Sequence, residues 1–533
     1  MKHIQLLDCT LRDGGYLNQW KFGVQNISTI LESLIQAGID MIECGFLTEC
    51  NYNEKYTLFP DTTYVDRIFG EKDAALFPVA MIAIGEKEIH PDKLAPAENT
   101  GVRGIRLTFH LNEKEKAMEW GNLLMEKGYQ VFMQPVGSAN YSDEELLGLI
   151  RDMNRMKPYA FYLVDTLGTM YQQDIRRLLY LVDNNLSPDI CLGLHSHNNM
   201  QMSFANAQEL IHFPTKRNLF IDCCIYGMGR GAGNLCTELL SNYMNQLEPG
   251  RYETLPLIEC IDQCLMYFFS KYPWGYSAAY YLAASCHCHP NYATFLMAKQ
   301  KMSVCEIEGL LEKIPEEKRL VFHKDEIVTL YENYQNHSVD DKKERKRMEE
   351  QIRGKRIVIL GSGASLKKEK KRLASYLKKK SCFVIGVNGS PKGFPVDMVF
   401  VGNEKRYQFL KEEIDWEKTV FTSNIRGLPE KARVVNYSNL TNSSMDASDN
   451  AGLMLLKLLR KLGVKHVEMA GFDGYTGNPA LNYADLHLVG SVETLEYRNK
   501  NKANTKQLNQ LSKEMEIIFL TSTRYRVPKA RRV

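Results

Sequence analysis

The chain has 533 residues, a length typical of about three domains. Its composition, with 44% hydrophobic and 25% charged residues, is that of an ordinary soluble globular protein, and a net charge of +3 does not by itself indicate a nucleic-acid partner, so we expect none. No stretch of about 18 apolar residues is free of charges, and the N-terminus lacks the apolar core of a signal peptide, so we expect neither a membrane span nor secretion. The 13 cysteines lack framework spacing, which indicates reduced thiols and a cytoplasmic location.

Residues 1–250 alternate short apolar runs with helical patterns, at a spacing of roughly 25–35 residues that is typical of βα units. Eight such units predict an N-terminal (β/α)8 TIM barrel within an α/β protein. The predicted strands are Ile4–Leu7, Met41–Phe46, Leu76–Ile84, Ile105–His110, Gln130–Gln134, Ala160–Asp165, Ile190–His195 and Leu219–Tyr226.

The remaining chain divides into three parts. Residues 251–335 are predicted as a helical extension that completes the active site of the barrel. Residues 336–354 are densely and oppositely charged, which predicts a linker or a solvated helix. From residue 355 to residue 533, strands and helices alternate again, and the pattern predicts an open, doubly wound α/β domain.

Polar residues follow the predicted strands one, seven and eight, which are neighbours in a closed eight-stranded barrel. Arg12 and Asp13 follow the first strand, His195 and His197 end the seventh, and Asn234 lies after the eighth. Residues two apart in a strand project to the same face, so both histidines can point into the barrel mouth. We therefore predict a divalent metal site with open positions for a bidentate substrate, with Arg12 steadying an anion beside it.

Three ordered motifs resemble the DRE-TIM metallolyases, which include 3-hydroxy-3-methylglutaryl-CoA lyase, isopropylmalate synthase and 4-hydroxy-2-oxovalerate aldolase. They are Thr-Leu-Arg-Asp-Gly (residues 10–14), His-Ser-His-Asn-Asn (residues 195–199) and Gly-Met-Gly-Arg-Gly-Ala-Gly-Asn (residues 227–234). The resemblance covers roughly residues 1–300. It implies a barrel enzyme whose ligands Asp13, His195, His197 and Asn234 hold Mn²⁺ by preference, with Mg²⁺, Co²⁺ or Zn²⁺ as alternatives.

Within the superfamily, the chain most resembles the 4-hydroxy-2-oxovalerate aldolase branch, through residues 164–170, 226–234 and 274–280. This resemblance places a catalytic tyrosine at Tyr276 and substrate binding at Thr166. The family's basic histidine is replaced by Tyr16, so Tyr16, His110 or a metal-bound water takes that role, or the substrate differs.

Glu43 matches an acid that is common in strand two of the superfamily. Its preferred interpretation is a buried carboxylate that orients Arg12 beside the substrate, and the alternative is a direct part in catalysis.

The resemblance implies a class II, pyruvate-type aldolase that cleaves or forms a 4-hydroxy-2-oxo acid through a metal-bound enolate stabilised by Arg12. Its partners would be a 2-oxo acid, an aldehyde and a second copy of the chain in a homodimer. One alternative is a Claisen-type acyl-CoA lyase or synthase on the same barrel, although Gly15-Tyr16 replaces the Glu-Gln of condensing members. The other is a degenerate barrel that serves as scaffold for a C-terminal transferase.

In the C-terminal domain, a strand runs into Gly361-Ser362-Gly363-Ala364-Ser365, and Asn388 follows the next strand. Backbone N–H groups of such a turn can hold a phosphate, although a tight strand-to-helix turn is the simpler interpretation. Together with Ser448-Asp449-Asn450 and residues 469–475, the set is similar to bacterial sialyltransferase-like and pterin diphosphokinase-like domains. The resemblance implies a nucleotide or nucleotide-sugar site at Gly361, Ser362, Gly363, Ser365 and Asn388.

Overall fold

The structure is a computed structural model that describes residues 3–69, 77–299, 302–336, 339–379, 381–441, 450–478, 481–484, 497–527 and 531–532. It divides into two compact units. Unit 1 comprises Met1–Asn291 with Glu317–Val321, and unit 2 comprises Tyr292–Glu316 with Phe322–Val533. Among the described residues, no helix combines the length and the apolarity that crossing a membrane requires.

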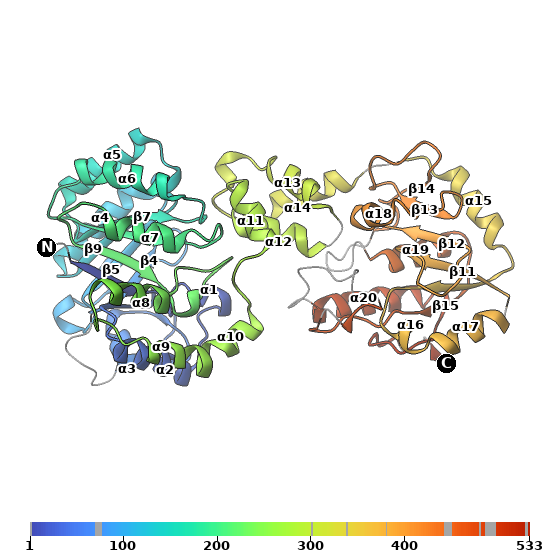
Figure 1. Cartoon of the computed structure of the whole chain (residues 1–533), viewed down its shortest axis with the longest axis horizontal. Coiled ribbons are helices and arrows are strands. Elements are labelled where there is room, and N and C mark those ends of the chain that lie inside the picture. Colours follow the sequence, from blue (N-terminus) through green and yellow to red (C-terminus); the bar gives the residue numbers. More distant parts are fainter. Residues whose placement is uncertain are drawn as a thin grey trace. The chain divides into compact units, whose positions relative to one another are not determined.

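Unit 1 is a closed barrel of parallel strands (Figure 1). In the described part of the chain, eight strands form the ring, and pairing of β1 with β2 closes it. A two-residue strand, β3 (Leu58–Phe59), is added outside the ring against β2. The ring strands are β1 (Ile4–Asp8), β2 (Met41–Leu47), β4 (Phe77–Ala83), β5 (Gly104–Phe109), β6 (Gln130–Pro135), β7 (Ala160–Asp165), β8 (Cys191–Ser196) and β9 (Leu219–Cys223).

Helices surround the ring, so the strands are buried on both faces, as in other parallel sheets. One apolar cluster, which includes Leu6 and Ile30, lies between strands and helices, and another, which includes Leu7 and Phe132, fills the barrel interior. The surrounding helices are α2 (Val24–Gln36), α3 (Thr62–Phe69), α4 (Lys114–Glu126), α5 (Asp143–Met156), α6 (Gln172–Asn185), α7 (Ser203–His212) and α8 (Thr237–Leu247).

Local sequence explains where these helices start. Helix α5 begins after Ser142, whose hydroxyl accepts from the N–H of Glu145 while the Glu145 carboxylate accepts from the N–H of Ser142. Further short helices lie in loops and after the ring: α1 (Gly15–Asn18), η1 (Pro91–Lys93), η2 (Ala97–Asn99), η3 (Leu111–Glu113), η4 (Ser138–Asn140), η5 (Ile225–Gly227), α9 (Leu255–Cys260), η6 (Ile261–Leu265), α10 (Met266–Lys271), α11 (Ala278–Ser285) and η7 (Glu316–Lys318).

Unit 2 contains an open parallel sheet in the order β14-β13-β12-β11-β10-β15-β16-β17. The chain moves outward from β10 to β14 and then returns to the other side of β10, so the order reverses between β10 and β15. The strands are β10 (Arg356–Leu360), β11 (Cys382–Val387), β12 (Met398–Val401), β13 (Thr419–Thr422), β14 (Arg433–Val435), β15 (His466–Ala470), β16 (Glu516–Phe519) and β17 (Arg531–Arg532).

Helices cover both faces of this sheet. Ile359 lies in one apolar cluster with residues of α15, α19 and α20, and Leu360 lies in another with residues of α16 and α17. The helices in this part of the chain are α12 (Pro290–Lys299), α13 (Val304–Leu311), α14 (Lys324–Gln335), α15 (Lys342–Ile352), α16 (Ser365–Lys368), α17 (Lys370–Lys379), α18 (Glu404–Leu410), α19 (Ala451–Lys461) and α20 (Tyr497–Leu511).

The predicted fold class, a TIM barrel followed by an open, doubly wound α/β domain, is confirmed. The charged stretch 336–354 holds helix α15, which buries Met348 and Ile352, four residues apart, on one face. The predicted helical extension, residues 251–335, contains α9 to α14 and is divided between the two units.

Candidate metal centre and active site

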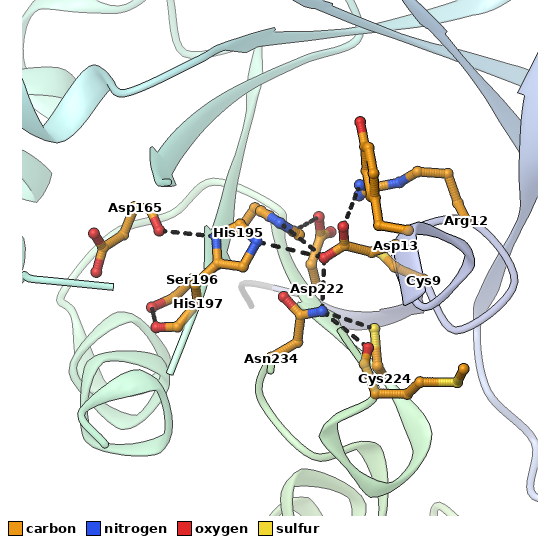
Figure 2. A network of polar contacts seen from close by, with 12 residues as sticks. Cys9, Arg12, Asp13, Asp165, His195, Ser196, His197, Asp222, Cys224 and Asn234 are labelled. Carbon is orange, nitrogen blue, oxygen red and sulfur yellow. Dashed lines mark hydrogen bonds and ion pairs between the residues drawn. The ribbon is translucent and has the colours of Figure 1, made fainter. Parts of the chain in front are cut away.

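The four predicted metal ligands lie together at the carboxyl ends of three adjacent strands (Figure 2). Asp13 is in the turn after β1, His195 and His197 are at the end of β8, and Asn234 follows β9. β9 pairs with both β1 and β8, and an additional bridge joins His197 to Asn234. All four side chains are buried.

The Asp13 carboxylate is the centre of this group. Its Oδ2 lies 3.5 Å from Nε2 of His197 and 3.8 Å from Nε2 of His195, and it accepts a hydrogen bond of 2.6 Å from Nδ2 of Asn234. Its Oδ1 lies 3.1 Å from Nη1 of Arg12. Burial would raise the pKa of Asp13, but the surrounding groups, foremost the Arg12 guanidinium, outweigh burial and hold this pKa well below its usual range. The carboxylate is therefore ionised.

Hydrogen bonds on the far side of each imidazole fix how the histidines face Asp13. Nδ1 of His195 lies 2.8 Å from Oδ2 of Asp222, and Nδ1 of His197 lies 3.2 Å from the carbonyl oxygen of Asp165. These oxygens accept, so each Nδ1 carries the proton and each Nε2 turns a lone pair toward Asp13. Burial also lowers the pKa of His195 and outweighs Asp222, which acts in the opposite direction. The lowered pKa keeps this ring neutral.

This donor set fits a divalent metal ion. One carboxylate oxygen and two imidazole lone pairs lie within 4.8 Å of one another, and outer hydrogen bonds of this kind are typical of metal-bound histidines. Asn234 adds a further donor, because its buried Oδ1 has no hydrogen-bond partner among the described residues, whereas its Nδ2 donates to Asp13 and to the carbonyl of Met228. A buried polar atom without a partner is uncommon and fits a ligand position.

The sequence of the barrel is similar to that of known proteins. Residues 112–258 match the HMGL-like family. The chain is 27% identical over 252 residues to the 4-hydroxy-2-oxovalerate aldolase of Chloroflexus aurantiacus (46% of this chain, 71% of the relative), and 28% identical over 248 residues to 4-hydroxy-2-oxovalerate aldolase 3 of Cupriavidus necator (45% and 70%). These matches support the predicted resemblance of the barrel to the DRE-TIM metallolyase superfamily. These relatives also support the prediction of a carbon–carbon lyase.

Among solved structures, hydroxymethylglutaryl-CoA lyase from Pseudomonas aeruginosa is similar, with a TM-score of 0.42 and 15% identity over 51% of this chain and 94% of that one.

Behind the candidate ligands lies a buried chain of charges that the sequence did not reveal. Nε of Arg12 donates to Oε2 of Glu43 at 2.7 Å, and Nη1 of Arg106 donates to the same oxygen at 2.8 Å. Nη2 of Arg106 donates to Oδ2 of Asp222, the oxygen that also accepts from His195. Arg106 therefore connects the residue that orients Arg12 to the residue that orients His195. The available signal was an arginine in the middle of a predicted strand.

Arg12 is held in a defined orientation by these contacts. Its Nε is bonded to Glu43 and its Nη1 faces Asp13, while its buried Nη2 has no hydrogen-bond partner among the described residues. Nη2 is thus the group that can donate to a substrate. The geometry agrees with the interpretation of Glu43 as the carboxylate that orients Arg12.

Two further residues predicted to be catalytic, Tyr276 and His110, have no contact with this group among the hydrogen bonds and ion pairs of the described residues. Tyr276 lies between α10 and α11 and is 61% exposed. His110 precedes η3, and its backbone N–H donates to Glu113 Oε2 at 2.9 Å. In the described part of the chain, neither forms a hydrogen bond or ion pair with the ligands. Thr166, directly after β7, accepts through Oγ1 a hydrogen bond of 2.9 Å from the N–H of Gly137.

Tyr16, which stands where the aldolase pattern has a basic histidine, lies in α1. Its hydroxyl donates to Oε2 of Glu86 at 3.3 Å, and the guanidinium of Arg230 lies 3.7 Å from its ring centroid. Burial raises the pKa of Tyr16 above its usual value. A neutral phenol with a hydrogen bond to a carboxylate is not suited to act as a base near pH 7, so this geometry does not support Tyr16 in that role.

The glycine-rich turn of unit 2 uses several of its N–H groups internally. Gly361 donates to the carbonyl of Ala470 at 2.8 Å, and Gly363 donates to that of Gly471 at 2.9 Å. The N–H of Ser365 donates to Oδ2 of Asp473 at 2.7 Å, and the Ser365 hydroxyl donates to Oδ1. A carboxylate of the chain itself therefore occupies the position at which a phosphate was expected.

The other predicted contributors to this site are near the same edge of the sheet. Asn388 follows β11 with a left-handed φ of 56°, and its Oδ1 accepts from the N–H of Gly402 at 3.0 Å. Ser362 accepts through its carbonyl from the N–H of Ala484 at 2.9 Å. Ser448 and Asp449 lie outside the described residues.

Proposed function

We propose that the barrel is a divalent-metal-dependent aldolase that cleaves or forms a 4-hydroxy-2-oxo acid. The observation that carries the proposal is the pair of histidine Nε2 lone pairs directed at the ionised Asp13, beside an arginine with one free donor. The similarity to relatives named 4-hydroxy-2-oxovalerate aldolase supports the substrate class.

The metal ion would be held by Asp13, His195, His197 and Asn234. Mn²⁺ is our first choice for this ion, and Mg²⁺, Co²⁺ or Zn²⁺ also suit the donors. When bound, the ion supplies a Lewis acid for the oxygens of the 2-oxo acid. Nη2 of Arg12 donates to the oxygen on which negative charge develops as the carbon–carbon bond breaks.

The remaining assignments rest on the family resemblance. The Thr166 hydroxyl would bind the substrate carboxylate, and Tyr276 and His110 are the candidates for the proton transfers. Because proton transfer by a positioned side chain contributes on the order of 10²–10⁴-fold, His110→Gln and Tyr276→Phe should each lower kcat to that extent if the assignments hold. A loss of less than tenfold in either variant would remove that residue from the mechanism.

Loss of the central carboxylate tests the aldolase proposal. We expect Asp13→Asn to lose bound Mn²⁺, measured by inductively coupled plasma mass spectrometry, and to release pyruvate from 4-hydroxy-2-oxovalerate at least about 100-fold more slowly. Asp189→Asn, at an exposed site, is the matched control and should retain both properties. An Asp13→Asn protein with full metal content and turnover would refute the proposal. Turnover only with acetyl-CoA would indicate the Claisen-type alternative, and a metal-free, inactive wild type would indicate a scaffold.

We also propose that unit 2 binds a nucleotide or nucleotide sugar where the strand order reverses between β10 and β15, because open α/β sheets bind ligands in that crevice. Ser362 follows β10 and Asn388 follows β11, the other neighbour of β10 in the sheet, whereas the N–H of Ser365 is already bonded to Asp473. Thermal shifts with a panel of nucleoside mono-, di- and triphosphates and sugar nucleotides test the proposal, and no stabilisation by any of them would contradict it. The proposed homodimer is tested by sedimentation velocity.

A further inference from the structure

We propose that Arg230 binds an anionic group at the end of the substrate that is remote from the metal centre, so that the aldehyde partner carries a carboxylate or a phosphate. The inference rests on the proposed aldolase function and narrows its substrate class.

The backbone at Arg230 is fixed against the metal centre. A Cβ at Gly229 would lie 2.2 Å from Nδ2 of Asn234, and one at Gly231, where φ is +67°, would lie 2.7 Å from Oδ1 of Asn199. Only glycine fits such close contacts, so the loop packs directly against the side chains of Asn234 and Asn199. Arg230 is the single charged side chain between residues 229 and 233.

The side chain of Arg230 is fixed as well. Its guanidinium stacks 3.7 Å from the ring centroid of Tyr16, which is three residues beyond Asp13. Edge contacts with Trp20, at 4.8 Å between centroids, and with Phe46, at 6.0 Å, hold the Tyr16 ring in turn. The stack positions a guanidinium beside the site without using its hydrogen-bond donors.

No carboxylate neutralises this cation. In the described part of the chain, no Asp or Glu oxygen lies within 4.0 Å of the Arg230 guanidinium. The nearby Glu86 accepts from Tyr16 and pairs with Lys87 at 3.5 Å. The pKa of His289 is lowered to about 3, mainly by burial and further by the nearby charges of Arg230 and His197. His289 is therefore neutral.

The two arginines then have different tasks. Arg12 faces Asp13 with its free Nη2, where the 2-oxo acid portion reacts. Arg230 extends from the loop after β9 over Tyr16, on the aldehyde side, and presents a planar fork to a carboxylate or phosphate. A neutral short aldehyde leaves this fork without a partner.

The test measures kcat/KM of the Mn²⁺-loaded full chain for addition of pyruvate to propanal, to succinic semialdehyde and to glyceraldehyde 3-phosphate. The last two separate carboxylate from phosphate recognition. We expect the wild type to prefer at least one anionic aldehyde, and the ratio of its kcat/KM to that of propanal to fall about 10- to 100-fold in Arg230→Met, as expected for loss of charge-assisted hydrogen bonds. Arg230→Lys should keep part of the preference, and the exposed Arg151→Met should keep all of it.

A second measurement does not need turnover. Calorimetric titration of the Mn²⁺-loaded protein with inorganic phosphate and with succinate should show binding by the wild type that is weakened at least about tenfold in Arg230→Met. If propanal is turned over as well as both anionic aldehydes, or Arg230→Met leaves the ratio unchanged, the inference is refuted while the aldolase proposal stands. If no aldehyde reacts, the aldolase proposal fails, and calorimetry alone decides: equal binding of both anions by wild type and Arg230→Met overturns the assignment of Arg230.

Discussion

Replacement of Arg106 by methionine tests whether the buried charges of the barrel hold the metal centre in place. Arg106 has no exposed surface and donates to Glu43, to Asp222 and, at 3.2 Å, to the sulfur of Cys9. Methionine fills a similar volume but leaves two buried carboxylates without their shared cation. Both carboxylates orient residues of the site, so the substitution acts on folding and on metal binding together.

The expected loss of unfolding free energy in Arg106→Met follows from the number of carboxylates that Arg106 binds. Removing one member of a buried ion pair costs about 3–5 kcal/mol, because the remaining charge is left in a poorly solvating interior. Arg106 serves Glu43 and Asp222 at once, so we expect a loss at the upper end of that range, against a total stability of about 5–15 kcal/mol for a typical domain. Because Asp222 orients His195, metal affinity should fall about 10- to 100-fold.

Urea unfolding followed by tryptophan fluorescence measures the first effect, since three of the four tryptophans lie in unit 1, at Trp20, Trp120 and Trp274. Titration with Mn²⁺ measures the second. The double variant Arg106→Met/Glu43→Gln lacks one of the two carboxylates that lose their cation. Its loss of unfolding free energy should therefore be smaller than the sum of the two single-variant losses by about 1 kcal/mol or more. An Arg106→Met protein within about 1 kcal/mol of the wild type, with unchanged Mn²⁺ affinity, would refute the reasoning.

Two further predictions concern buried aspartates. Burial raises the pKa of Asp8 to about 6, so the folded state binds this proton more tightly than the unfolded chain and stability is lost as pH rises from about 4 to 6. Asp8→Asn should remove that loss: its unfolding free energy relative to wild type should rise by about 3 kcal/mol across this window, and a flat difference would contradict the shift. In unit 2, Asp473→Ala removes the carboxylate that accepts from the Ser365 N–H and hydroxyl, while Thr521 Oγ1 remains as an acceptor for the hydroxyl. The substitution should cost about 1–2 kcal/mol, seen as faster hydrogen exchange of the Ser365 amide, and an unchanged exchange rate would show that the contact contributes little.

The barrel and its ligands could be predicted because their signals are local. Each strand and helix leaves its own period in the sequence, and a polar residue just after a buried strand must lie at the carboxyl edge of the ring. Asp13, His195, His197 and Asn234 could therefore be placed together without any knowledge of their contacts.

The role of Arg106 could not be predicted in this way, because it depends on ion-pair partners that are distant in the chain. Glu43 and Asp222 lie 63 and 116 residues from it and meet it only inside the closed ring. Tyr276 shows the opposite limit, because it was nominated by resemblance alone. His110 follows β5 and so lies at the carboxyl edge of the ring, but its sequence position does not show whether it reaches the metal centre.

The glycine-rich turn of unit 2 illustrates an ambiguity that sequence cannot resolve. Glycine is needed where a backbone approaches a phosphate and equally where it approaches another part of the protein. At Gly363 the second reason holds, since a Cβ would lie 2.6 Å from Cγ of Asp473 and from the carbonyl oxygen of Gly471. The same pattern of residues thus describes an internally capped turn, and any nucleotide must find its donors elsewhere along the sheet edge.

The stacking of Arg230 on the ring of Tyr16 explains why the chain departs from the aldolase pattern at this position. A neutral phenol replaces a basic imidazole, and Arg230 stacks on its ring, so the two positions act as one feature. In the proposed mechanism the metal ligands and Arg12 act on the 2-oxo acid, so they do not select among aldehydes. Selection is therefore expected from other groups near the metal centre, and Arg230, which has no carboxylate partner among the described residues, is such a group. Substituting Tyr16 should therefore alter the preference for anionic aldehydes in the same direction as substituting Arg230, because the platform positions the charge.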